Sequence, residues 1–340
     1  MVTQYLKELL NALTLCYGPS GREGAAANVI VQYLKRYTDK ISIDASGNVI
    51  AKIPSYNPKA RKILVDAHYD EISMYVTKIS DNGEVFVGAK GVDLRTLLAS
   101  EVIIHGLNEV FGVVAVPPVH MLSKEDRNKL PEFNELIIFT GYDAQKLKKL
   151  VKVGDPVTYR ANTTALNGNC FCGKAMDNRS GVCALLCCLE ILRGKRSNYE
   201  LNFLFSTQEE INLSGAATGA FNIDPDIAIS VDVTFGKTNK DNFEEQGEMG
   251  KGVMIGYAPI LNSKISNTFA ELAQRAKIPY QKEIMAGNTG TNCASITLAQ
   301  QGVPAGLLSI PLRYMHTQVE TLNIADIAYT AALLSEFLTN

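Results

Sequence analysis

The stretch that decides how this chain folds is KILVDAHYD, at residues 62–70. Residues 62–67 form a short, mostly apolar run, which is typical of a strand buried inside a sheet. The run ends at His68, Tyr69 and Asp70, so an imidazole and a carboxylate follow it directly. In an open α/β sheet, ligand sites form at the carboxyl ends of the strands. We therefore expect a buried strand that delivers functional groups to one edge of a sheet.

On either side of this stretch, helical and strand-like patterns alternate. Apolar residues at helical spacing predict two helices over 5–16 and 23–37, and a hairpin over 41–53 follows them. After residue 174 the elements expected are a helix over 180–192, a strand over 201–206, a helix over 215–220, a strand over 227–233, a helix over 264–276, a strand over 307–310 and a helix over 324–338. This order predicts an α/β fold with a doubly wound mixed sheet sandwiched by helices.

The pattern changes between residues 72 and 163. Short strand-like runs separated by turn residues fill this stretch, and its one convincing helix lies over 144–150. Such a pattern is typical of a small β-rich module. We therefore predict a discontinuous α/β domain over 1–71 and 164–340, interrupted by an inserted β-rich domain over 72–163.

The composition is that of a soluble protein with a sizeable core, because 46% of the 340 residues are hydrophobic and 20% are charged. The net charge is −2 and the lysines and arginines are dispersed, whereas nucleic-acid binding needs clustered positive charge. The chain has no uncharged apolar stretch of the roughly 18 residues that a membrane span needs. Its first residues lack the pattern of a signal peptide. We therefore expect no nucleic-acid partner, no membrane partner and a cytoplasmic location.

The seven cysteines also favour a reducing compartment. Their number is odd, and Cys183, Cys187 and Cys188 lie in one helical pattern, where cysteine behaves as a small buried apolar residue. Cys170 and Cys172 are separated by one residue and lack the second pair that a structural zinc site needs. The cysteines are therefore not expected to hold a metal.

Histidines and carboxylates follow several of the predicted strands at the point where each strand ends. Because these ends meet at one edge of the sheet, the side chains are expected to lie close together. The residues at these positions are His68 and Asp70, Glu209 and Glu210, Asp232 and His316, together with Asp177 just before the helix over 180–192.

Each of these residues has an ordinary explanation when it is taken alone. An adjacent pair of glutamates most often belongs to a solvated surface, and Asp177 could simply cap the helix that follows it. Asp232 is harder to explain in this way, because it follows an apolar run and a buried carboxylate needs a partner. The joint pattern therefore favours a metal site.

The residue types fit a site for two divalent cations. Two ions about 3.5–4 Å apart need a bridging carboxylate together with further carboxylates and imidazoles. Such ligands suit zinc or cobalt, with manganese as a third candidate. Glu209 and Glu210 could divide the work of general base and metal ligand. Asp70, two residues after His68, is placed to accept the second ring N–H of that histidine and to orient it.

Five short motifs occur in the order and spacing of one known family. They read HYDE at 68–71, AMDNRSG at 175–181, QEE at 208–210, VDVT at 231–234 and RYMH at 313–316. The chain resembles the tetrahedral (TET-type) metallo-aminopeptidases, which include glutamyl aminopeptidases and proteins historically labelled endoglucanases. The likeness runs from Ser20 to Asp326 and covers nearly the whole chain.

The resemblance implies a metal-binding role for five of the candidate residues. His68 and Asp232 would complete one metal site, Glu210 and His316 would complete the other, and Asp177 would bridge the two.

By the same resemblance, Glu209 would act as the general base and Asp70 would orient His68. The family's fold is a metallopeptidase α/β sandwich, and its inserted small β-barrel-like domain, here 72–163, supplies dimer contacts. Its members build hollow dodecamers from dimers, so the resemblance implies a homo-oligomer. His120 follows two prolines and resembles a Pro-Pro-His stretch of that inserted domain.

Two positions depart from the family's pattern. Asn212 stands where the family usually has glycine, and asparagine can adopt the same left-handed conformation. Asn292 stands where the family's Gly-Thr-Asp-Ala segment has a carboxylate, a position that we expect to lie near the substrate pocket. Neither change removes a predicted ligand or the predicted base.

The function predicted from these observations is that of a dinuclear metallo-aminopeptidase, which removes the N-terminal residue from short peptides. Two alternatives remain open: a di-metal deacylase or amidohydrolase acting on N-acyl amino acids, and a non-catalytic scaffold that retains a peptidase fold. A glycosidase is disfavoured because it needs two carboxylates flanking a sugar bond rather than a metal cage. Degenerate ligands would favour the scaffold, and all five predicted ligands are present.

Overall fold

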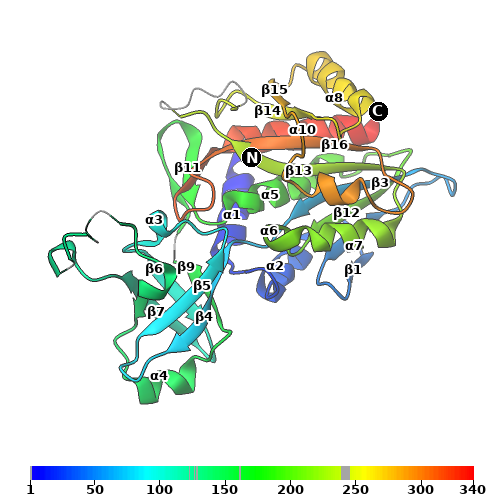
Figure 1. Ribbon diagram of the computed structural model, residues 1–340. Helices are drawn as coiled ribbons and strands as arrows, with labels where there is room; N and C mark the ends of the chain where they lie inside the picture. The colour runs from blue at the N-terminus through cyan, green and yellow to red at the C-terminus, as the bar shows by residue number, and fades with distance from the viewer. Residues whose placement is uncertain (1, 122, 126, 128, 161, 239–245) are drawn as a thin grey trace. The chain divides into compact units, whose positions relative to one another are not determined.

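The computed structural model describes residues 2–121, 123–125, 127, 129–160, 162–238 and 246–340. The chain divides into two compact units (Figure 1). The first, called the α/β unit, comprises Met1–Glu71, Thr163–Met315 and Glu320–Asn340. The second, called the barrel unit, comprises Ile72–Asn162 and His316–Val319.

The α/β unit is built on a mixed sheet of eleven strands. Nine of them follow one path, in the order β1 (Ile41–Ile43), β2 (Val49–Ile53), β12 (Glu200–Ser206), β3 (Lys62–His68), β13 (Ile227–Phe235), β16 (Ala305–Arg313), β17 (Glu320–Asn323), β11 (Cys170–Gly173) and β10 (Thr164–Ala165). Two more lie off this path, namely β14 (Val253–Tyr257), which pairs with β16, and β15 (Tyr280–Ile284). The strands β12, β3, β13 and β16 run parallel, so their carboxyl ends meet at one edge.

Helices cover both faces of this sheet (Figure 1). One face carries α1 (Val2–Leu15), α2 (Gly24–Leu34), α5 (Met176–Leu192), α8 (Ser263–Ala276) and α10 (Ile324–Thr339). The other face carries α7 (Ser214–Ile223) and the short α9 (Cys293–Ile296). The side chains of β3 alternate between the two cores: Ile63 and Val65 pack with the long helices, and Leu64 packs with α7 and α9. Both faces of this strand are buried, which is why its sequence is a nearly continuous apolar run.

The barrel unit closes six strands into a small barrel. Their order is β4 (Ser73–Ile79), β5 (Val85–Lys90), β8 (Ile137–Phe139), β7 (Glu109–Ala115), β6 (Glu101–His105) and β9 (Pro156–Tyr159). Two short helices, α3 (Leu94–Leu97) and α4 (Ala144–Leu150), belong to the same unit. Along β7, Val110 and Val114 are buried whereas Phe111 is exposed, as the period of two in a strand requires. Closing the barrel removes the unpaired strand edges that an open sheet would expose.

The fold class predicted from the sequence is confirmed, since helices sandwich a doubly wound mixed sheet and a small β-barrel accompanies it. The prediction lacked β14 and β15, because one is a short run containing a glycine and the other alternates with polar residues. Asn212 does not use the left-handed conformation that asparagine can adopt: it ends α6 (Glu209–Asn212), and the left-handed residue is Leu213, with a φ of 62°. None of the helices in the described ranges is long and apolar enough to cross a membrane.

Candidate metal centre

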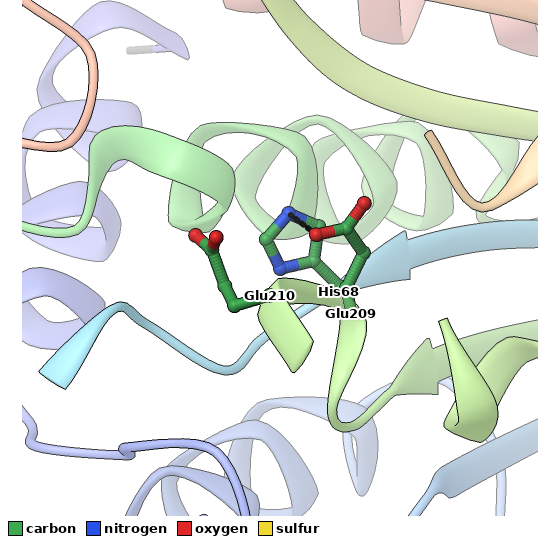
Figure 2. A group of neighbouring side chains, drawn as sticks. All are labelled: His68, Glu209 and Glu210. Carbon is green, nitrogen blue, oxygen red and sulfur yellow. Dashed lines mark ion pairs between the residues drawn. The ribbon is translucent and has the colours of Figure 1, made fainter. Parts of the chain in front are cut away.

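The parallel strands of the α/β unit bring acidic and imidazole side chains to one edge of the sheet. His68 is the last residue of β3, and Asp232 lies within β13. After β12 the chain passes through Gln208, whose φ of 57° is left-handed, and enters the single-turn helix α6 with Glu209 and Glu210. Figure 2 shows the imidazole of His68 between the carboxylates of these two glutamates.

The Nε2 atom of His68 faces carboxylates from three different elements. It lies 3.1 Å from Oδ1 of Asp177, 3.6 Å from Oδ1 of Asp232 and 3.9 Å from Oε2 of Glu209. The Glu209 contact is the dashed line in Figure 2. One ring nitrogen carries at most one proton, so it cannot donate to all three carboxylates. The imidazole and the three carboxylates therefore surround a position that favours a positive charge.

Asp177 lies in the first turn of α5, where its backbone departs from helical geometry, with φ −78° and ψ 107°. The residue that caps the regular helix is the next one, because Oδ1 of Asn178 accepts the N–H of Gly181 at 2.9 Å. The capping role that the sequence allowed for Asp177 is therefore taken by its neighbour. The backbone N–H of Asp177 donates to Oε2 of Glu320, on β17, at 3.1 Å.

Asp70 is fully buried and accepts hydrogen bonds from two parts of the chain. The hydroxyl of Ser20 donates to Oδ2 at 2.6 Å, and the backbone N–H groups of Glu209 and Glu210 donate to the carboxylate at 3.1 and 3.2 Å. Its Oδ1 also lies 3.3 Å from Nδ1 of His68. Asp70 therefore contacts the imidazole and, in addition, fixes the backbone of both glutamates.

The surroundings of Glu209 and Asp232 disfavour negative charge on these two carboxylates. Burial raises the pKa of Glu209, and the charges of neighbouring carboxylates add to that rise. Burial also raises the pKa of Asp232. At His68 burial opposes the charged form, but the surrounding carboxylates, Glu209 foremost, outweigh it and hold the pKa of the imidazole well above its usual range. Without a metal ion, His68 and Glu209 therefore hold their protons more tightly in the folded protein.

The residues present fit a divalent metal ion. One ligand atom from each of His68, Asp177 and Asp232 lies within 4.8 Å of the other two, and the same is true of His68, Glu209 and Glu210. Imidazole nitrogens and carboxylate oxygens are the donors that zinc, cobalt and manganese accept. Within the ranges that the structure describes, Glu209 and Asp232 form ion pairs with His68 but not with a lysine or an arginine. A bound cation would therefore neutralise a buried negative charge that these side chains leave uncompensated.

His316, the remaining predicted ligand, follows β16 in the segment His316–Val319, which groups with the barrel unit. Its backbone is left-handed, with a φ of 62°, and its Nδ1 lies 3.2 Å from the carbonyl oxygen of Gly91 in the same unit. A proton on Nδ1, directed at that carbonyl, would place the lone pair on Nε2, where a metal binds. Its part in the metal site stays a prediction from the sequence. His120 is exposed in a short 3₁₀ helix, Val119–Met121.

That Asn292 lies near the substrate pocket stays a prediction from the sequence. This residue is 1% exposed, and its amide donates to Asp66 and Ser206 inside the α/β unit. Two further contacts near the site were not predicted, those of Ser20 with Asp70 and of Glu320 with the backbone of Asp177. Of these residues only Ser20 carried a signal in the sequence, because the family likeness begins there.

The sequence matches the profile of the family described as M42 glutamyl aminopeptidase over residues 47–333. A lysyl aminopeptidase of Pyrococcus furiosus is 31% identical over 337 residues, which cover 97% of this chain and 96% of that protein. Both matches span the predicted ligands and the predicted base.

Two solved structures share this fold over almost their whole length. An aminopeptidase of the archaeon Desulfurococcus kamchatkensis superposes with a TM-score of 0.93 at 31% identity, covering 99% of this chain and 95% of that one. A TET1 peptidase of Pyrococcus horikoshii, described as assembling into a tetrahedron or a large octahedral shell, gives a TM-score of 0.86 at 27% identity, covering 98% and 99%. The resemblance seen in the sequence is thereby confirmed, and a peptidase is favoured over a deacylase and over a non-catalytic scaffold. The chain therefore belongs to the M42 glutamyl aminopeptidase family and is a metal-dependent aminopeptidase, a hydrolase of peptide bonds.

Proposed function

We propose that this aminopeptidase binds two divalent metal ions through five side chains. His68 and Asp232 hold one ion, Glu210 and His316 hold the other, and Asp177 bridges the two. The observation that carries the proposal is the convergence on one imidazole nitrogen of carboxylates from three elements, two of them buried and the third, Glu209, largely buried. The combination of imidazole and oxygen ligands favours zinc or cobalt, with manganese as a third candidate.

Glu209 is the general base in this proposal. When bound, ions of this kind supply Lewis-acid chemistry, since they polarise a carbonyl oxygen and make a water molecule more acidic. Glu209 accepts the proton of the attacking water and returns it to the nitrogen of the leaving amine as the C–N bond breaks. Burial raises the pKa of Glu209 in the metal-free site, and bound cations would lower it again, which leaves the carboxylate ionised as a base must be.

Asp70 is the residue that holds base and ligand in place. Its carboxylate accepts the backbone N–H of Glu209, and it lies against the imidazole of His68 on the side away from the other carboxylates. A carboxylate in this position fixes the tautomer of the imidazole and raises the basicity of its other nitrogen. Asp70 therefore acts through these two residues rather than on the substrate.

The substrate that we propose is a short peptide with a free N-terminus. The family profile and the lysyl aminopeptidase relative support removal of an N-terminal residue. A cluster of carboxylates also attracts the positively charged amino group of such a peptide.

The assignment of the ligands is tested by counting metal ions in purified variants. We expect two ions per chain in the wild type, close to none in Asp177→Ala, and about one in Asp232→Ala, because only Asp177 serves both sites. Elemental analysis after dialysis against limiting zinc measures these counts. Two ions retained in Asp177→Ala would reject the bridging role.

For the assembly we propose dimers that build a dodecamer, with the barrel unit supplying the dimer contacts. Phe111 is 44% exposed and Phe139 is 59% exposed. Phe139 pairs directly with Val113, two residues from Phe111, so both aromatic rings lie on one outer face of the barrel. Exposed aromatic side chains grouped in this way are typical of an interface between subunits, and the TET1 relative also assembles into large shells.

Light scattering tests this assembly. The wild type should have about twelve times the 37.0 kDa mass of one chain. The double change Phe111→Glu and Phe139→Glu should reduce that mass, because it places like charges at the proposed contact. A mass unchanged by this variant would place the dimer contact elsewhere.

We also place the enzyme in the cytoplasm. All seven cysteines are free in the structure, and Cys183, Cys187 and Cys188 are buried in α5. Unpaired cysteines of this kind fit a reducing compartment. Titration of the denatured protein should therefore give seven thiols per chain.

A further inference from the structure

Next to the candidate metal centre lies a second buried polar group, which the proposed chemistry does not use. We call it the Asp66 cluster, and it consists of Asp66, Ser206, Ser230 and Asn292. Asp66 accepts the hydroxyl of Ser206 at 2.7 Å, the hydroxyl of Ser230 at 3.0 Å and Nδ2 of Asn292 at 2.9 Å. The same Nδ2 atom also donates to Oγ of Ser206 at 2.9 Å. Each of the four residues is at most 1% exposed.

The members of the cluster lie one step along the strands from the proposed ligands. Asp66 is two residues before His68 on β3, and Ser230 is two residues before Asp232 on β13. Side chains two residues apart on a strand point to the same face, so the cluster and the metal centre form successive layers on one face of the sheet. The register agrees, because Asp66 pairs with Ser230 and His68 pairs with Ser206.

Asn292 brings a fourth segment of the chain into the cluster. It directly precedes α9 and is 226 residues from Asp66 in the sequence. The carboxylate of Asp66 dictates how the amide is turned, because the NH₂ group can donate to it whereas the amide oxygen would be repelled. An ionised acid at position 292 could not make this contact. The asparagine therefore complements the acid at position 66.

A carboxylate at position 66 is costly if its only task is to stabilise the fold. Two neighbours of this position on the same face of the sheet, Leu64 on β3 and Leu204 on β12, are apolar and fully buried. An apolar residue at position 66 would avoid the desolvation of a charge. Asp66 forms no ion pair with a lysine or an arginine in the part of the chain that the structure describes. Its hydrogen bonds instead fix the distances between four segments.

We propose that Asp66 is a positioning residue of the metal centre and that Asn292 is the partner that sets its geometry. This inference rests on the proposed function, since it takes His68 and Asp232 as ligands and Glu209 as the base. By tying β3, β12, β13 and the segment before α9 together, the cluster holds these groups at the separation that the ions require. Groups behind the ligands typically change metal affinity or activity roughly 10–100-fold when they are removed.

The test exchanges the acid and the amide between the two positions. The wild type is compared with three variants: Asp66→Asn, Asn292→Asp and the double exchange. Chelator competition measures the zinc affinity of each, and kcat, KM and the melting temperature are measured alongside. Asn292→Asp sets two acids against each other, and Asp66→Asn replaces a carboxylate that accepts three hydrogen bonds with an amide that has one oxygen. In both variants we therefore expect zinc affinity roughly 10–100-fold weaker and a lower kcat at little-changed KM. The double exchange restores one acid and one amide, and the serine hydroxyls can donate or accept, so it should recover most of the loss.

A buried carboxylate whose side chain binds a backbone loop rather than a proposed ligand serves as the first control. Asp326 is 0% exposed and accepts the backbone N–H groups of Gly250 and Gly252 at 2.6 and 2.9 Å. Asp326→Asn should therefore change the melting temperature while the zinc affinity stays at the wild-type value.

A matched pair of serines provides a milder comparison, which also holds if the acid variants fail to fold. Ser230→Ala removes a donor to Asp66, and Ser266→Ala removes a buried hydroxyl that donates to the carbonyl oxygen of Gly256 at 2.7 Å. We expect a several-fold loss of zinc affinity in the first variant and none in the second.

Two results would overturn the inference. Zinc affinity that stays at the wild-type value in Asn292→Asp and Ser230→Ala, while the melting temperature falls as in the controls, would assign the cluster to fold stability alone. A double exchange no better than the weaker single variant would show that the two positions do not act as a pair. A wild type that binds no zinc would overturn the proposed function, and this inference with it, so the wild-type measurement separates the two failures.

Discussion

The two units of the molecule bury very different side chains, although each has its own apolar core. In the described part of the barrel unit, the buried polar residues are Ser100 and Thr158, and neither carries a charge. The α/β unit buries many residues that can carry one: Glu23, Asp66, His68, Asp70, Glu71, Lys174, Asp177, Arg179, Asp232, Glu283, Glu320 and Asp326.

This difference locates the chemistry of the protein. Burying a charge costs several kcal/mol unless a partner compensates it. Some buried charges are compensated within the chain, as in the pair of Lys174 with Glu71 at 2.6 Å. Glu209 and Asp232, by contrast, share one imidazole. In the proposed function an external cation compensates this group, whereas an apolar barrel core needs none.

Removal of the metal should have the largest effect, because an aminopeptidase of this family depends on metal for hydrolysis. We expect hydrolysis of aminoacyl-anilides to fall below about 1% after chelation and to return with zinc or cobalt. An N-acetylated anilide should be inert throughout, since it lacks the free amino group. Circular dichroism of the metal-free protein checks that it remains folded. A metal-free protein with its full rate would break the comparison between the units.

Glu209→Gln should have the next largest effect. The amide keeps the size of the side chain but cannot accept a proton, so we expect kcat to fall roughly 10²–10⁴-fold while two ions remain bound. Glu271→Gln, at an exposed position on α8, is the matched control and should leave kcat unchanged. If Glu209→Gln hydrolysed peptides at the wild-type rate, another group would have to be the base.

Asp70→Asn should weaken metal affinity or activity by about 10–100-fold. The amide can still accept a hydrogen bond, but it cannot serve the hydroxyl of Ser20 and the backbone N–H groups of α6 as a carboxylate does. Ser20→Ala removes one of these bonds and should have a smaller effect in the same direction. Equal losses in both variants would mean that Ser20, rather than the whole set of contacts, sets the orientation of Asp70.

The part of the site that lies at strand ends could be predicted because strand and functional group are contiguous in the sequence. Residues 62–70 contain both the apolar run and the residues that follow it. The same is true of Asp232, which continues the apolar run of β13.

The rest could not be predicted, because it depends on contacts between distant segments. Ser20 lies 50 residues from Asp70, and Asn292 lies 226 residues from Asp66, and no periodicity records either contact. The choice of Asn178 over Asp177 as the helix cap depends on a local turn of the backbone. Sequence patterns indicate burial and spacing, whereas these contacts depend on tertiary packing.

The metal should also reverse how stability depends on pH in the α/β unit. In the metal-free protein, burial opposes charge on His68, but the surrounding carboxylates outweigh burial and raise the pKa of the imidazole. Burial raises the pKa of Glu209 as well. Both groups thus hold protons more tightly in the folded chain than in the unfolded chain. Above the unfolded pKa of imidazole, about 6.5, the unfolding free energy of the metal-free protein therefore falls as pH rises.

Metal binding must displace these protons, so its contribution to stability grows with pH. We expect the gap in melting temperature between the zinc-loaded and metal-free proteins to widen between about pH 6 and about pH 8. Differential scanning calorimetry at equal zinc excess measures this gap. A gap that narrows with rising pH would contradict the protonated state inferred for the metal-free site.

The smallest effect on metal binding is expected from a change in the core of the barrel unit. Ile138 is fully buried on β8, so Ile138→Ala should lower the unfolding free energy of this unit by about 2–5 kcal/mol, and Ile138→Val by about 0.5–1.5 kcal/mol. Ile138 pairs with Val85 at the start of β5, whereas His316 contacts Gly91, which follows the last residue of β5. Zinc affinity at 25 °C should therefore stay at the wild-type value in both variants. A loss of affinity as large as that of Asp70→Asn would show that the metal centre depends on the barrel core, and the contrast between the two units would not hold.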